Sequence, residues 1–332
     1  MTNVWHPGKL LSTSSAYWQG CTLQSAVRLK VFSILEEKQM SGEDVASELG
    51  SDAISTILFL DALSAMGLLL KKNERYRNCP ESEKYLIESS PDYMGHIILH
   101  HHHLLDGWAQ LDQVIQTGNP AQKRSYGQAE ERESFLMGMF NLAMQIAPQI
   151  ADQIELTGRS RLLDLGGGPG TYAIHFCKAN PNLSAVIFDR PTTEPFAQQT
   201  VATFGLSDRI SFEAGDFNSD PITCGPYDVA WLSHILHSNT MDQCFEIIAK
   251  CVRSMKKGGM VLIHDFILDD SKDGPEFPAL FSLNMLIGGT GGRSYSEEEI
   301  CNMLRASGVP QPQRHPFKSK NDSSIIYGIV EK

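Results

Sequence analysis

The sequence has none of the features that mark membrane-spanning, secreted or disulfide-rich proteins. Its longest apolar runs, such as 263–268, are interrupted by a charge, and none approaches the ~20 residues that cross a bilayer. The first residues hold no charged leader before a long apolar stretch, so we expect no secretory signal. The seven cysteines are odd in number, scattered and without a CxxC pair, which predicts reduced thiols. We therefore expect a cytoplasmic protein with no membrane partner.

Clusters of basic residues are also missing. The 332-residue chain carries 39 acidic and 28 basic side chains, and its formal net charge is −11. Basic residues occur in short pairs such as Lys71–Lys72 and Lys256–Lys257, whereas binding to the phosphate backbone of nucleic acid needs a clustered basic face. We therefore expect no nucleic-acid partner.

Residues 1–105 have the pattern of a small helical domain. Apolar positions in 23–39 form one broad helical face, and a second helix begins after the N-cap Ser41 and ends at Gly50. A longer third helix and a hairpin with a turn at Asn73 complete a winged-helix pattern. The third helix contains no Arg or Lys, although a DNA-recognition helix needs basic and polar side chains. Dimerisation or packing is therefore favoured over DNA binding.

The remainder, residues 106–332, begins with linker helices and changes from residue 161 onward to alternating strands and helices. Six apolar segments are strand candidates, which begin near residues 160, 183, 210, 227, 258 and 323. Strands that alternate with helices predict a parallel sheet with helices on both faces. The expected fold class is α/β, a Rossmann-like doubly wound sheet preceded by an α-helical winged-helix domain.

A glycine-rich loop follows the first of these strands, in the segment RLLDLGGGPG at 161–170. In an open parallel sheet the ligand lies beyond the carboxyl ends of the strands, where this loop is expected. Gly166, Gly168 and Gly170 are spaced G-x-G-x-G, which differs from the G-x-G-x-x-G of dinucleotide-binding proteins. Asp164, just before the loop, would oppose a pyrophosphate but suits an ammonium or sulfonium group. A nicotinamide-dependent dehydrogenase is therefore disfavoured.

Acidic residues follow the next two strands as well. Asp189 ends the second strand, where a carboxylate can bridge the two hydroxyls of a ribose. Asp216 follows the third strand, with Phe217 beside it, at the expected place of an adenine. Each acid alone is explained as a strand-end cap, but three at the ends of successive strands indicate one ligand. S-Adenosyl-L-methionine fits these groups, with S-adenosyl-L-homocysteine as its product.

Five motifs occur in an order and spacing that can be compared with known families: LLDLGGGPG, FDRP, GDF, ILH and MKKGGMVLIHD. Together they resemble the dimeric S-adenosylmethionine-dependent O-methyltransferases of small molecules, which include plant caffeate and isoflavone, hydroxyindole and bacterial secondary-metabolite enzymes. The resemblance covers nearly the whole chain. It implies a homodimer formed through the N-terminal domain, a small and hydroxylated aromatic acceptor, and pocket-lining side chains in FLMGM at 135–139.

The same resemblance assigns His237 as the general base that deprotonates the acceptor hydroxyl, a role that suits histidine because it titrates near neutral pH. It places His234 where the family often has a residue that contacts the cofactor. The sequence departs from the family at Ser238 and Asn239, which replace Asp-Trp, and at Ser294, which replaces a glutamate that orients the base. Asp265, near the end of the fifth strand, is the candidate replacement for that glutamate.

These departures keep other functions open. A carbon or nitrogen acceptor, or a cofactor-binding enzyme with chemistry other than methylation, is compatible with the altered segment after His237. A ligand-sensing winged-helix regulator is the alternative from a different class. The histidine run within GHIILHHHHLLDGW, which includes His100–His103, has helical spacing that could gather metal ligands, but no acid or cysteine completes a shell. We interpret it as pocket lining or a solvated helix and expect no metal site.

Overall fold

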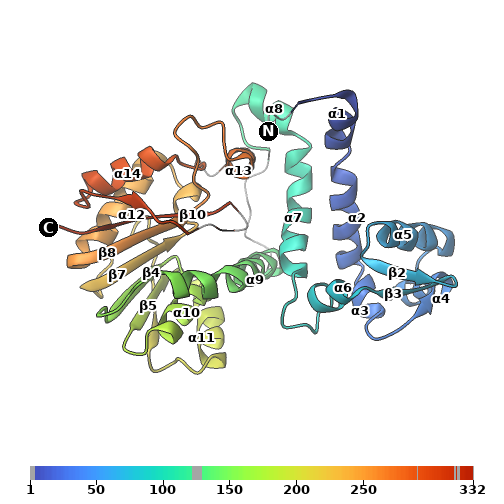
Figure 1. Cartoon of the computed structure of the whole chain (residues 1–332), viewed down its shortest axis with the longest axis horizontal. Coiled ribbons are helices and arrows are strands. Elements are labelled where there is room, and N and C mark those ends of the chain that lie inside the picture. Colours follow the sequence, from blue (N-terminus) through green and yellow to red (C-terminus); the bar gives the residue numbers. More distant parts are fainter. Residues whose placement is uncertain (1–3, 122–128, 290, 318, 320–321, 332) are drawn as a thin grey trace. The chain divides into compact units, whose positions relative to one another are not determined.

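The structure is a computed structural model that describes residues 4–121, 129–289, 291–317, 319 and 322–331. The chain forms two compact units. The first combines Met1–Leu105 with Tyr126–Leu142, and the second combines Asp106–Ser125 with Ala143–Lys332. Figure 1 shows the elements of both, and each unit is described below by itself.

The first unit contains short helices around a small antiparallel sheet. Its helices are α1 (Pro7–Ser14), α2 (Tyr17–Arg28), α3 (Val31–Ile34), α4 (Gly42–Leu49), α5 (Ala53–Ala65) and α6 (Pro80–Tyr85). Its strands are β1 (Met40–Ser41), β2 (Leu69–Lys72) and β3 (Arg75–Asn78), in the order β1-β3-β2. This arrangement has the expected winged-helix pattern, and its apolar core includes Phe32, Leu60 and Tyr76.

Local signals set the helix boundaries in this unit. Ser41 and Asp44 form a reciprocal capping box at the start of α4, and Gly50 ends that helix with a left-handed φ of 63°. The continuous helical face expected over 23–39 is wrong in one respect, because Lys30 adopts a φ of 58° and separates α2 from α3. The break lets Val31 and Phe32 enter the core, where both are fully buried.

Three helices follow the first unit's hairpin along the chain. They are α7 (Gly95–Trp108), α8 (Leu111–Thr117) and α9 (Ala129–Gln153). Linker helices were expected within 106–332, whereas α7 begins before residue 106 and Tyr126–Leu142 belongs to the first unit. The second unit then contains the large sheet, with strands β4 (Arg161–Leu165), β5 (Ser184–Asp189), β6 (Ile210–Ala214), β7 (Tyr227–Ser233), β8 (Met255–Asp265), β9 (Gln313–Arg314) and β10 (Ser324–Ile329).

The order of strands in the large sheet is β6-β5-β4-β7-β8-β10-β9. Strands β4 to β8 pair in parallel, as expected, but β10 pairs antiparallel with both β8 and β9. The expectation of a wholly parallel sheet is therefore wrong at one edge. The cause is local: the chain reverses after the short strand β9, which was not expected, and returns as β10 between β9 and β8.

Helices cover both faces of this sheet, as expected for a doubly wound fold (Figure 1). One face packs against the end of α9 with α10 (Thr171–Ala179) and α11 (Glu194–Thr203). The other packs against α12 (Met241–Arg253) and α14 (Glu297–Ala306), while α13 (Glu276–Ile287) precedes α14. The carboxyl ends of β4, β5, β7 and β8 therefore lie at one edge, which is where ligands bind in such sheets.

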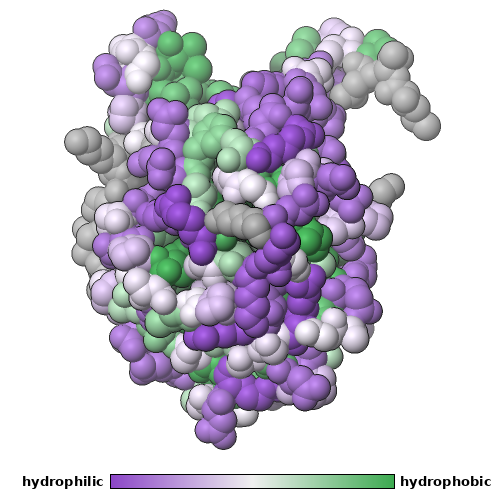
Figure 2. All heavy atoms as spheres, turned by 90° about the vertical axis from the view of Figure 1, so that its left-hand side faces the viewer, coloured by the Kyte–Doolittle hydropathy of each residue, from purple (hydrophilic) through white to green (hydrophobic). Residues whose placement is uncertain are grey.

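The surface and the helices agree with the polar composition of the chain. Among the described residues, the structure has no helix that is both long enough and apolar enough to cross a membrane. Hydrophilic side chains cover most of the face drawn in Figure 2, with hydrophobic ones in small patches between them.

Candidate active site

The glycine loop after β4 has a backbone that larger residues would not adopt. Gly166, Gly168 and Gly170 all have left-handed φ angles, of 67°, 54° and 83°. A Cβ atom on Gly166 would also lie 2.2 Å from Ile235 Cδ1 and 3.2 Å from Phe217 Cε1. The loop is thus held close to the segment after β7 and to Phe217, two parts of the chain that the sequence places far apart.

Asp164 lies directly beneath this loop and is 1% exposed. Its Oδ2 accepts a hydrogen bond of 3.1 Å from the N–H of Ala173, whereas its buried Oδ1 has no partner among the residues that the structure describes. Burial, with the negative charge of Asp189 adding to it, raises the pKa of Asp164 to about 7. An acceptor buried without a partner is costly, so a cationic ligand beside Asp164 would be strongly favoured.

Asp189 and Asp216 lie at the same edge of the sheet. Asp189, the last residue of β5, accepts hydrogen bonds from the N–H of Gly168 at 2.8 Å and of Arg190 at 2.7 Å. Burial raises its pKa. Asp216 lies two residues beyond β6, and its Oδ2 is 3.9 Å from Nε of Arg190. The structure therefore brings the predicted cofactor residues after β4, β5 and β6 to one place.

His237 lies in a short 3-10 helix (Leu236–Ser238) that follows β7. Its Nδ1 is 2.6 Å from Oδ1 of Asp265, the last residue of β8, and its backbone N–H donates to Oδ2 of the same carboxylate. The two side chains are almost fully buried. With a carboxylate at Nδ1, the hydrogen-bond network assigns the ring proton to Nδ1 and leaves Nε2 as the acceptor atom.

Asp265 provides the carboxylate that the sequence lacks at Ser294. Burial alone would raise the pKa of Asp265, but the facing imidazoles of His237 and His234 hold it well below its usual range. Ser294 is fully buried and its Oγ has no partner within the described part of the chain. In the parallel pairing of β7 with β8, Ser233 lies opposite His264. This register brings Asp265, the next residue of β8, beside His237, which follows the end of β7.

An aromatic cluster surrounds His237 in the second unit. The ring of Phe281, from α13, meets the His237 ring edge-on with centroids 4.8 Å apart. Phe266 lies nearly parallel to that imidazole at 6.3 Å, and it contacts both Phe277 at 4.9 Å and Phe281 at 4.7 Å. The group that can accept a proton thus lies beside aromatic side chains suited to a flat, apolar ligand.

Asn284 is a candidate residue that the sequence interpretation missed. It lies three residues after Phe281 and seven after Phe277, so the three share one face of α13. Asn284 is buried, and its Oδ1 has no partner in the described residues. The helical spacing of these three residues indicates from sequence that they share one face. Only the structure, in which Phe281 packs against His237, shows that this face lies beside the candidate site.

His234 adopts a left-handed backbone, with a φ of 57°, which is uncommon for a residue other than glycine. Its N–H donates to the carbonyl of His264 at 2.8 Å, and its Nδ1 is 3.6 Å from Oδ1 of Asp265. Its ring packs on Phe266 with centroids 4.7 Å apart. The structure thus places His234 beside the His237–Asp265 pair, and its expected contact with the cofactor stays a prediction.

The histidine run on α7 makes contacts within the first unit. The rings of His100 and Phe135 meet edge-on at 5.3 Å, and His102 Nε2 lies 3.1 Å from Nη1 of Arg28. Metal ions in proteins are bound by histidine, cysteine and acidic side chains. Within the described residues, one group of three such side chains has ligand atoms close enough to share an ion, and it consists of His234, His237 and Asp265. The pocket-lining role of FLMGM stays a prediction.

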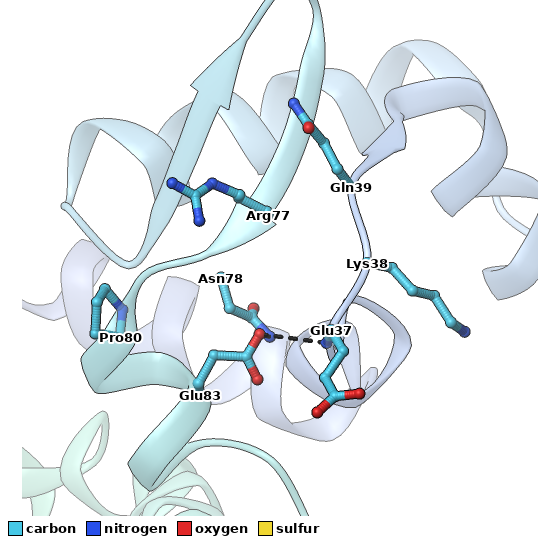
Figure 3. A pocket seen from close by; sticks show the side chains of 7 residues that line it. All are labelled: Glu37, Lys38, Gln39, Arg77, Asn78, Pro80 and Glu83. Atoms are coloured by element: carbon cyan, nitrogen blue, oxygen red, sulfur yellow. Dashed lines mark hydrogen bonds between the residues drawn. The ribbon is translucent and has the colours of Figure 1, made fainter.

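A separate pocket of about 330 Å³ lies in the first unit and contains none of the predicted site residues. Figure 3 shows its lining from the β3–α6 segment and the stretch before β1. Glu83 and Glu37 approach each other there, because a carboxylate oxygen of Glu83 accepts a bond from the N–H of Glu37 at 3.4 Å. Acidic and basic side chains are mixed around this pocket, so no charge class of ligand is favoured.

Comparison with models of known protein families identifies the family of this chain. A model of the O-methyltransferase domain matches residues 104–310, and a model of the O-methyltransferase dimerisation domain matches residues 11–88. The chain belongs to the O-methyltransferase family. The expected family and fold class are therefore confirmed, and this O-methyltransferase carries the dimerisation domain that the N-terminal helices indicated.

Individual relatives match along most of the chain. A 3-hydroxy-5-methyl-1-naphthoate 3-O-methyltransferase of Streptomyces sahachiroi is 31% identical over 97% of this chain and 95% of its own length. The tetracenomycin polyketide synthesis 8-O-methyl transferase TcmO of Streptomyces glaucescens is 33% identical, with 92% of each chain covered. The structure of human N-acetylserotonin methyltransferase in complex with SAM is 24% identical, with a TM-score of 0.87 over 100% of both chains, and shows the same fold.

Proposed function

We propose that this O-methyltransferase moves a methyl group from S-adenosylmethionine to a hydroxyl of a small aromatic molecule, with His237 as general base. The observation that carries the proposal is the buried His237–Asp265 pair, joined at 2.6 Å beside Phe266 and Phe281. The two bacterial relatives support the acceptor class, because their names describe methylation of oxygen on a hydroxynaphthoate and in the synthesis of a polyketide.

The cofactor residues fit S-adenosylmethionine. Asp164, with its partnerless Oδ1, would hold the ammonium of the methionine part, Asp189 the ribose hydroxyls, and Asp216 with Phe217 the adenine. The bound cofactor supplies a methyl group made electrophilic by the neighbouring sulfonium. Gly166 and Gly168 allow this ligand to approach the backbone closely. Because transfer is an in-line displacement, the main task of these groups is to hold the reacting atoms in line.

The chain's own residues provide the path for the acceptor's proton. Nε2 of His237 takes the proton of the hydroxyl, so that the oxygen gains nucleophilic character. Nδ1 of the same ring keeps its hydrogen bond to Asp265, whose low pKa keeps the carboxylate ionised. The negative charge then stabilises the imidazolium that forms. Asp265 is thus a positioning residue that acts through His237.

The acceptor site in the second unit is aromatic and carries few polar groups. Phe266, Phe277 and Phe281 would stack on a flat ring, and Asn284 would hydrogen-bond a substituent of that ring through its unpaired Oδ1. An unpaired amide oxygen favours an acceptor with a donor group in addition to the methylated hydroxyl.

The first unit and the thiols support proposals for the oligomeric state and the location. The dimerisation domain supports a homodimer, and we infer that exposed apolar side chains on the first two helices, namely Leu10, Leu11, Tyr17 and Trp18, form part of its interface. All seven cysteines are free, which supports action in a reducing compartment such as the cytoplasm.

The test uses paired acceptors that differ in one atom. Wild type and His237→Gln are incubated with methyl-labelled S-adenosylmethionine and either a hydroxynaphthalene or the matching aminonaphthalene, and products are identified by mass spectrometry. We expect label on oxygen with the wild type and loss of that product in His237→Gln. Label on nitrogen or carbon alone, or equal labelling of oxygen by both proteins, would contradict the proposal.

A further inference from the structure

We propose that His234, His237 and Asp265 form a binding site for one divalent zinc-like metal ion, which disables the general base when it is bound. This goes beyond the expectation from sequence, which included no metal site. The inhibitory consequence rests on the proposed role of His237, whereas the metal site itself does not. The carrying observation is that the ligand atoms of these three residues all lie within 4.8 Å of one another.

The distances from Asp265 to the two imidazoles need only small shifts to reach metal-ligand geometry. Oδ1 of Asp265 is 2.6 Å from Nδ1 of His237 and 3.6 Å from Nδ1 of His234. In a tetrahedral zinc site with bonds of about 2.0–2.1 Å, neighbouring ligand atoms lie about 3.3 Å apart. The first pair would therefore separate by less than an ångström and the second would approach by a few tenths, which side-chain rotations can supply.

The environment of the triad favours capture of an ion. His234 is held by its left-handed backbone and by its packing on Phe266, so that its imidazole stays beside the carboxylate. Asp265 is buried between the two imidazoles, so its carboxylate already faces both of the other donors. Two imidazoles and one carboxylate leave a fourth position open, as in zinc sites that bind a water or a ligand.

The donor set also limits which ion can bind. Imidazole nitrogens suit zinc, nickel, copper and cobalt, whereas magnesium and calcium prefer oxygen ligands. Affinity should therefore separate these two groups of ions. Magnesium serves as a control, because it carries the same charge as zinc but prefers oxygen ligands to imidazole nitrogens.

Binding of the ion would change the protonation of His237 without a net gain or loss of protons. In the neutral form of the ring its one proton is assigned to Nδ1, because Oδ1 of Asp265 lies 2.6 Å from that nitrogen and can only accept. When Nδ1 becomes a metal ligand, that proton must move to Nε2. Nε2 can then donate but not accept, so the ring cannot take the proton of an acceptor hydroxyl. The same atoms would thus serve either as the base or as the metal site.

The experiment measures metal binding directly, on tag-free protein. Zinc and cobalt are titrated by equilibrium dialysis into wild type and into His234→Asn, with the visible spectrum of cobalt as a second readout. Asparagine tolerates the left-handed backbone better than most residues, so this variant removes the imidazole with little strain. His103→Asn, the same substitution in the histidine run of α7, is the matched control.

We expect one zinc site in the wild type and in His103→Asn, a tetrahedral-type cobalt spectrum, and no competition from magnesium. Loss of one of the three ligands in His234→Asn should weaken zinc binding by at least ~10-fold. Equal zinc affinity in wild type and His234→Asn, or loss of the site in His103→Asn, would overturn the proposal.

Two further readouts keep the test decisive. If His234→Asn does not fold, as judged by its thermal unfolding, His237→Gln replaces it and must show the same loss of zinc binding. The metal site and the proposed function can fail separately. A chain that binds zinc through the triad but methylates no hydroxyl contradicts only the proposed function, whereas a methylating chain with no such zinc site contradicts only the metal proposal.

Discussion

At the scale of single residues, two buried aspartates at the same edge of the sheet have opposite electrostatic properties. Burial raises the pKa of Asp164 to about 7, since one of its oxygens has no partner in the described residues. The pKa of Asp265 is low despite equal burial, because two imidazoles face it. The difference supports the separate roles proposed for them: Asp164 would bind a cationic ligand, whereas Asp265 is already paired with His237.

Asp265→Asn removes the charge that orients His237. An amide at this position can also donate to Nδ1 and favour the wrong tautomer, so kcat should fall by about 10²–10⁴-fold. The dissociation constant of S-adenosylhomocysteine should hardly change, because Asp265 is not a cofactor residue in this account. Steady-state kinetics and calorimetric titration check both values. Asp228→Asn, at the opposite end of β7, is the matched control, and comparable loss of kcat there would remove the special role of Asp265.

The raised pKa of Asp164 predicts a pH dependence of cofactor binding. In the free protein this carboxyl binds a proton more tightly than in the unfolded chain, so its burial costs stability increasingly as pH rises from about 4 to about 7. The ammonium of the cofactor favours the carboxylate, so binding expels that proton below pH 7. Affinity should therefore rise with pH, by up to ~10-fold per unit, and level off above about pH 7.

Titration of the cofactor across this pH range, with wild type and Asp164→Asn, measures that dependence. The variant has no proton to expel from this position, so its affinity should be weaker at pH 8 and should rise less with pH than that of the wild type. A wild-type curve that rises no more than that of the variant would show that Asp164 does not titrate on cofactor binding.

At the scale of elements, the glycine loop after β4 lies between two parts of the candidate site. Gly168 donates a hydrogen bond to Asp189, and Gly166 lies close to Ile235, two residues before His237. Gly166 has a left-handed φ, and a Cβ there would lie 2.2 Å from Ile235 Cδ1, so the end of that side chain would have to move. Gly168 has a similar φ but nothing within 4 Å of the place where its Cβ would be. The two glycines therefore separate the effect of backbone strain from the effect of crowding.

Gly166→Ala should destabilise the protein more than Gly168→Ala. A left-handed backbone costs alanine about 1–2 kcal/mol at either position, and the clash with Ile235 adds about 1–3 kcal/mol at Gly166 alone. Thermal unfolding measures the difference, and cofactor titration should show at least ~10-fold weaker binding in Gly166→Ala. If the two variants unfold at the same temperature, crowding at Gly166 does not lower the stability of the protein.

The sequence predicted those elements whose signals are local. The N-cap Ser41, the glycine that ends α4 and the strand–glycine–helix pattern after β4 depend on neighbours along the chain. The segment of β10 was predicted as a strand, but its antiparallel direction and the position of Asn284 depend on packing against other elements, so periodicity could not supply them. Asp265 was a candidate from sequence, but only the pairing of β7 with β8 shows that it reaches His237.

At the scale of the whole molecule, the dimerisation domain supports formation of a homodimer. The first unit carries exposed apolar side chains on α1 and α2, among them Leu11 at 71% and Trp18 at 63% exposure. Side chains of this size are rarely left in water over neighbouring helices without a partner. The dimerisation domain matches residues 11–88, which include both.

Trp18→Glu should therefore weaken the homodimer. Aromatic residues dominate interface energetics, and burying a charge in place of an indole should raise the dimer dissociation constant by about 30-fold or more. Analytical ultracentrifugation over a range of concentrations measures this constant. Ile329→Glu, on β10 in the second unit, is the control and should leave the dimer intact. Equal dissociation constants for Trp18→Glu and wild type would place the interface elsewhere.

The central claim is that His237 takes the proton of an acceptor hydroxyl, and acceptors of graded acidity test it most directly. The ratio of kcat/KM between wild type and His237→Gln is measured for phenols from weakly acidic to already ionised at the assay pH. The account predicts a ratio of about 10²–10⁴ for the weakest acids, which shrinks toward one as the acceptor needs no base. A ratio that is the same for all acceptors, or that is one throughout, would contradict it.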